Sequence, residues 1–176
     1  MLRHTSALLL LFFLGGCASS GLVTIKGAND QLEEYITVSS FGYDRPTMGV
    51  IPFTTADAFF RANINKASKN QSIQLYIMAN SYDWSYWNEA RFNSGSGLTK
   101  IKLDRISSDV KCSQYGCAHY EDMIGRLTIE QVKSFANSQS PVVIRIGSNK
   151  VSNTVDFKIT PQEAMAFLAK LEMANP

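Results

Sequence analysis

Residues 142–171 read VVIRIGSNKVSNTVDFKITPQEAMAFLAKL, and this stretch decides the fold class. Apolar and polar residues alternate in 142–146 and again in 154–159, which is the period of half-buried β-strands. The residues between them begin with the turn-forming sequence GSNK at 147–150, so the two strands are predicted to form a hairpin. A capping threonine and a proline follow at Thr160 and Pro161, and apolar residues then recur at helical spacing. We therefore expect a C-terminal helix near 161–173 packed on a sheet.

The rest of the chain extends this pattern. Strands are predicted at residues 34–41, 73–78, 84–93, 101–104 and 118–127, and residues 22–25 could add a short one. Residues 54–67 are ambiguous, because 54–57 can cap a helix while 59–67 read as a strand. The capping box at residues 128–131, TIEQ, predicts a short helix near 129–136. Polar residues on one face of several strands favour antiparallel pairing. The predicted class is mainly β (α+β): an antiparallel sheet or β-sandwich with these two helices.

The N-terminus has the features of an export signal. Arg3 supplies a positive charge, and residues 7–14 form an apolar run that is too short to span a membrane. The sequence Leu14-Gly15-Gly16-Cys17 resembles the lipobox of bacterial lipoproteins. The resemblance implies cleavage before Cys17, acylation of that cysteine with chains such as palmitate, and stable anchoring. Ala18 in place of aspartate implies the periplasmic face of the outer membrane rather than the inner membrane.

Length and charge limit the organisation and the partners. The 176 residues are divided into a signal peptide at 1–16, a lipidated tether at 17–27 and a single β-rich domain at 28–176. The formal net charge is only +2, so the clustered basic surface of a general nucleic-acid binder is not expected. The β-rich domain resembles small lipoproteins of the bacterial envelope, a likeness that assigns no site residue.

Two cysteines remain once Cys17 is acylated. In an oxidising compartment, Cys112 and Cys117 are predicted to form a disulfide that closes a short loop. The alternative is a redox or metal pair. The spacing does not match a redox CxxC motif, and His119 is the only histidine outside the signal peptide. We therefore predict no metal site.

No catalytic motif is present in the sequence. His119 lacks a local nucleophile partner, and Asp104 and Asp109 could converge as a carboxylate pair only if the chain bends between them. The adjacent acids at 33–34 and 121–122 point to opposite faces of a strand and are interpreted as solvated side chains. No catalytic residue and no cofactor are predicted.

The most unusual feature is the aromatic cluster of residues 82–87, YDWSYW. In an extended strand, Tyr82, Trp84 and Tyr86 would share one face and Trp87 the other, with Arg91 able to cover Trp87 by a cation–π contact. These residues could be core, a protein-binding surface or a platform for sugar rings.

The leading hypothesis is a non-enzymatic, lipid-anchored envelope protein that binds another envelope protein or assists an assembly. The first alternative is a glycan- or peptidoglycan-binding module that uses the aromatic cluster. The second alternative is a small envelope hydrolase.

Overall fold

The computed structural model describes residues 23–41, 43, 54–95, 97–150, 152 and 154–175. The signal peptide, the lipobox and residues 17–22 of the predicted tether therefore lie outside the described residues. The described residues contain nine strands and two helices: β1 Thr24–Lys26, β2 Tyr35–Ser39, β3 Thr54–Asn65, β4 Gln71–Ser81, β5 Glu89–Asn93, β6 Leu98–Ser113, β7 Gly116–Leu127, α1 Ile129–Ala136, β8 Val142–Gly147, β9 Thr154–Ile159 and α2 Pro161–Ala174.

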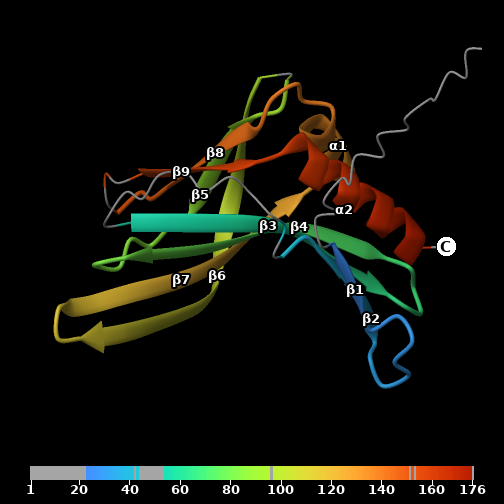
Figure 1. Cartoon of the computed structure of the whole chain (residues 1–176), viewed down its shortest axis with the longest axis horizontal. Coiled ribbons are helices and arrows are strands. Elements are labelled where there is room, and N and C mark those ends of the chain that lie inside the picture. Colours follow the sequence, from blue (N-terminus) through green and yellow to red (C-terminus); the bar gives the residue numbers. More distant parts are fainter. Residues whose placement is uncertain are drawn as a thin grey trace, which may run out of the picture.

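The nine strands form one antiparallel sheet in the order β1-β2-β3-β4-β7-β6-β5-β8-β9. The sheet curls, so that β9 at one end of the order comes close to β3 (Figure 1). This confirms the predicted mainly β class and its antiparallel pairing. The ambiguous segment 54–67 is a strand rather than a helix, because β3 finds partners on both sides in β2 and β4.

The core lies between the inner face of the curled sheet and the two helices. Phe60 of β3 packs against Phe135 of α1 and Phe167 of α2, with ring centroids 5.6 and 5.3 Å apart. Phe92 of β5 meets the same Phe135 ring at 4.9 Å. These four phenylalanine side chains thus join both halves of the sheet to both helices, and their burial is a principal source of stability.

Both predicted helices are present and start at the predicted caps. The Thr128 hydroxyl accepts from the Gln131 amide at 3.2 Å, and the Gln131 side chain accepts from the Thr128 amide at 2.8 Å. In α2, the Thr160 hydroxyl accepts from the Glu163 amide at 3.2 Å, and Pro161 occupies the first turn. These local bonds satisfy helix N–H groups that have no partner within the helix.

A buried carboxylate ties α2 to the sheet. The Ser40 hydroxyl donates to Glu163 Oε1 at 2.6 Å and accepts from the Phe60 amide at 2.9 Å. Glu163 is fully buried. Burial, together with the nearby charge of Glu163, raises the pKa of Tyr43 above its ordinary value. Local sequence patterns do not predict this hydrogen bond, because Ser40 and Glu163 are 123 residues apart in the chain.

Candidate binding site

The aromatic cluster lies in a loop rather than in a strand. We call residues 82–88, between β4 and β5, the aromatic loop. The predicted strand at 84–93 is wrong in its first half, because β5 begins only at Glu89. Tyr86 has a positive φ of 54°, a conformation that no regular strand adopts. The aromatic side chains therefore do not form the flat row that an extended strand would give.

Glu121 of β7 explains the shape of the aromatic loop. Its Oε1 atom accepts from the backbone amides of Ser85 at 2.8 Å and Tyr86 at 3.0 Å. Successive amides of a strand point to opposite sides, so one carboxylate can gather both only if the chain bends there. Glu121 is 1% exposed, and its Oε2 atom lies 3.7 Å from the guanidinium of Arg105. The interpretation of Glu121 as a solvated acid was wrong.

A signal for this burial exists in the sequence. Glu121 has the same strand parity as Met123, Gly125 and Leu127, all of which face the core. Its neighbour Asp122 points outward and accepts from the Tyr76 hydroxyl at 3.0 Å. Burial and this bond raise the pKa of Tyr76. A carboxylate in the apolar register of a strand indicates a buried acceptor that requires donors from elsewhere in the fold.

The four aromatic residues of the loop have different surroundings. Tyr82 and Tyr86 are exposed, Trp84 is half-buried, and Trp87 is only 2% exposed and belongs to the core. The Trp84 ring packs edge-on against His119 with centroids 4.8 Å apart. Trp87 cannot reach a ligand at the surface. The structure thus brings Tyr82, Trp84 and Tyr86 to the surface without aligning them.

Two cations that sequence reasoning missed lie against the aromatic loop. Lys150 and Arg105 stand over the Tyr86 ring at 4.3 and 5.5 Å from its centroid, and Arg105 is also 5.9 Å from the Trp84 centroid. No cation–π contact joins Arg91 to Trp87 in the part of the chain that the structure describes, and the Arg91 guanidinium bonds instead to Glu89 in the same strand. Arg105 and Lys150 come from other elements, so no spacing in the sequence places them here.

The β6–β7 hairpin projects from the body beside the aromatic loop. Figure 1 shows its tip on the left of the molecule and β1 on the right. Residues 104–113 of β6 are all exposed, and a bulge between Arg105 and Ser107 bends the strand where it leaves the sheet. The large hydrophobic side chains exposed along this ribbon are Ile106, Val110 and Tyr115, and Tyr115 is 87% exposed.

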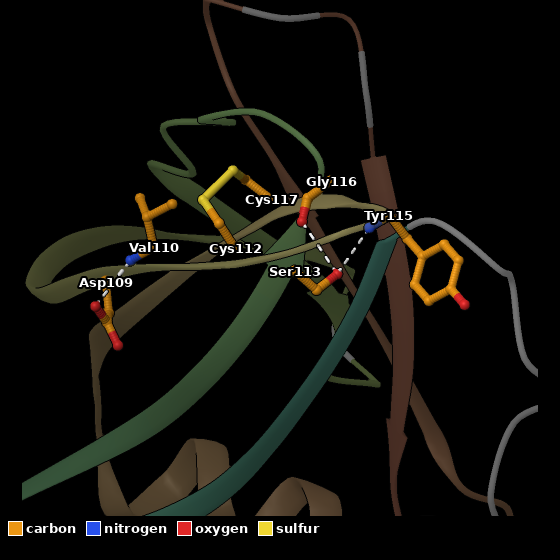
Figure 2. Close-up of a disulfide and its surroundings, with 7 residues drawn as sticks. All are labelled: Asp109, Val110, Cys112, Ser113, Tyr115, Gly116 and Cys117. Carbon is orange, nitrogen blue, oxygen red and sulfur yellow. Dashed lines mark hydrogen bonds between the residues drawn. A yellow bond between two sulfur atoms is a disulfide. The ribbon is translucent and has the colours of Figure 1, made fainter.

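A disulfide closes the hairpin near its tip. Cys112 and Cys117 are direct cross-strand partners with Cα atoms 4.0 Å apart, and their sulfur atoms lie at a bonding distance of 2.08 Å. Figure 2 shows this bond bridging the two strands, with the Tyr115 ring pointing away from the ribbon. At the turn, the Ser113 hydroxyl accepts from the Tyr115 amide at 3.2 Å. These links hold an otherwise solvated ribbon in one register.

The remaining candidate residues, Asp104, Asp109 and His119, do not converge. Asp104 and Asp109 lie opposite Ile124 and Tyr120 along one extended strand, so the chain does not fold them together. His119 packs on Trp84, and its Nδ1 atom has no hydrogen-bond partner among the described residues. In the same described part of the chain, no group of three His, Cys, Asp or Glu side chains could hold a metal ion.

Neither helix in the described ranges has the length and apolar character needed to cross a membrane.

No protein family model matches the chain, and comparisons with curated proteins and with solved structures found no match. The aromatic loop and the β6–β7 hairpin are therefore the features of the molecule that indicate a function.

Proposed function

We propose that this chain is a non-enzymatic, lipid-anchored protein of the bacterial envelope that binds another envelope protein through the β6–β7 hairpin and the aromatic loop. The lipobox ending at Cys17 supports the anchoring. The observation that carries the binding role is the exposed ribbon closed by the Cys112–Cys117 disulfide.

The composition of the hairpin supports contact through side chains. Ile106, Val110 and Tyr115 are exposed in an element that has no core of its own to fill. Tyrosine and exposed aliphatic residues on a rigid support lose little conformational entropy when they are buried by a partner. The carboxylate of Asp109 accepts from the Val110 amide at 2.8 Å, which occupies a backbone donor of the ribbon. We therefore expect a partner to contact the side chains of the ribbon rather than this amide.

The position of the hairpin agrees with an anchored protein. The described chain starts beside β1, at the opposite end of the molecule from the hairpin tip (Figure 1). A lipid attached upstream of β1 would leave the hairpin directed away from the attachment point.

The geometry gives less support to sugar stacking on the aromatic loop. Trp87 is buried in the core, and Arg105 and Lys150 already stand against the Tyr86 ring. Stacking on sugar rings requires open aromatic faces, and the cations reduce the area available on Tyr86. A protein partner can use the same side chains without needing a flat platform.

In-cell photo-crosslinking tests the proposal. A photoreactive amino acid replaces Tyr115 at the hairpin tip, and the matched control carries it at Leu32, which is 97% exposed at the β1–β2 end. We expect a discrete protein adduct from position 115 and none of the same mass from position 32. The same adducts from both positions, or none from position 115 in a chain present at normal levels, would contradict the proposal.

A further inference from the structure

A row of three cations crosses the outer face of β6, β5 and β8. Arg91 of β5 lies directly opposite Lys100 of β6 on one side and Arg145 of β8 on the other. All three side chains are exposed, whereas Ala90 and Phe92 on either side of Arg91 are buried in the core. Side chains at directly opposite positions of antiparallel strands are neighbours, and like charges there destabilise a sheet.

The acids around the row leave one charge uncompensated. Arg145 makes two bonds to Asp156, at 2.6 and 2.7 Å, and Arg91 bonds to Glu89. Lys100 makes no ion pair with any residue that the structure describes. The end of the row formed by Arg91 and Lys100 therefore keeps a net positive charge. One anionic group would balance it.

A cavity of about 460 Å³ opens at this end of the row. Arg91, Lys100 and Lys102 line it together with Asn88, Glu89 and the turn residues Ser148 and Asn149, and the Lys102 charge is paired with Asp104 at 2.7 Å. This volume lies within the range of small-molecule sites. The two cations can bind an oxyanion. The Asn88 and Asn149 side-chain amides and the Ser148 hydroxyl can donate hydrogen bonds to the hydroxyl groups of a ligand or accept them, and the Glu89 carboxylate can accept them.

We propose that this cavity binds a sugar unit that carries a single anionic group. The anionic group lies between Lys100 and Arg91, and the ring hydroxyls face Glu89, Asn88 and Asn149. The presence of Glu89 and the single uncompensated cation select a monoanion over a more highly charged group. This site uses neither the aromatic loop nor the hairpin, so it goes beyond the proposed function and can fail independently of it.

Ligand-observed saturation-transfer NMR tests the site. The full chain, purified in detergent micelles, is titrated with glucuronic acid, with glucose as the uncharged sugar and acetate as the anion without hydroxyls. We expect saturable transfer to glucuronic acid with a Kd of about 1 mM, which is ordinary for one sugar unit, and at least about tenfold weaker binding of glucose and acetate.

Two variants and a control test whether glucuronic acid binds in this cavity. Lys100→Gln and Arg91→Gln are each expected to weaken glucuronic acid binding about tenfold, because each removes a charged donor. Lys158→Gln is the matched control, because Lys158 is exposed on the same face opposite Val143 and does not line the cavity. The Lys100 side chain makes no hydrogen bond or ion pair with a described residue, so its variant decides the result if the Arg91 variant is misfolded.

Three results would overturn the proposal. Equal binding of acetate and glucuronic acid would show adventitious ion binding only. The absence of saturable transfer to glucuronic acid would exclude the sugar. A loss of binding in Lys158→Gln as large as that in Lys100→Gln would place the effect outside the cavity.

Discussion

Glu121 should be the residue on which the shape of the aromatic loop depends most strongly. Its carboxylate accepts from the amides of Ser85 and Tyr86 in a buried position. Glu121→Ala leaves both amides without their acceptor. Since each hydrogen bond to a charged group contributes about 1.5–3 kcal/mol and two are lost, we expect the free energy of unfolding to fall by about 3–6 kcal/mol. Glu121→Gln keeps one acceptor oxygen and loses the charge, so the expected loss is about 1–2 kcal/mol.

Urea unfolding at neutral pH measures both losses, with tryptophan fluorescence as the probe. Trp84 lies in the aromatic loop, so release of the loop should also change the emission of the folded state in both variants. Glu172→Gln is the control, because Glu172 is exposed on α2. The reasoning is refuted if both Glu121 variants unfold within about 0.5 kcal/mol of the unaltered chain, which is the range of ordinary surface changes.

Three further predictions concern the anchor, the disulfide and one ion pair. Cys17→Ser should accumulate as an uncleaved precursor without acyl chains, and palmitate labelling of that variant would disprove the lipobox interpretation. Alkylation of the denatured, unreduced protein should find no free thiol at Cys112 or Cys117, and removing this short-loop disulfide should cost about 2 kcal/mol; strong labelling would show that the two cysteines are reduced. Hydrogen bonding from Arg145 lowers the pKa of Asp156 despite its partial burial. The ion pair therefore stabilises the fold fully above the unfolded aspartate pKa of about 3.9, and this stabilisation is lost as the pH falls through the lower pKa of the folded state. Asp156→Asn should therefore cost about 0.5 kcal/mol at pH 7, and the difference should vanish in acid; a difference that persists there would contradict the linkage.

Elements with local causes could be predicted from the sequence. The caps at Thr128 and Thr160 need only residues within one helical turn, and both helices begin there in the structure. The β8–β9 hairpin depends on alternation and a turn, and its strands pair as expected. Such interactions depend little on the rest of the fold.

The site required contacts that are distant in the sequence. The aromatic loop has strand-like composition, but Glu121 bends it from 35 residues away. Arg105 and Lys150 reach Tyr86 from β6 and from the connection between β8 and β9. The cationic row depends on the register of β5 with β6 and β8, and β8 lies far from β5 in the chain. Composition could identify the unusual segment but not its neighbours.

The most direct test of the proposed function is the affinity of the crosslinked partner for surface variants of the full chain. Val110→Asp combined with Tyr115→Asp places charges on the exposed hairpin, where the body of the fold has no contact to lose. Leu32→Asp is the control on the opposite end. We predict that the hairpin variant binds the partner at least about tenfold more weakly, a difference of about 1.4 kcal/mol, while the Leu32 variant binds as the unaltered chain does. Equal affinity of all three chains would contradict a hairpin that binds an envelope protein.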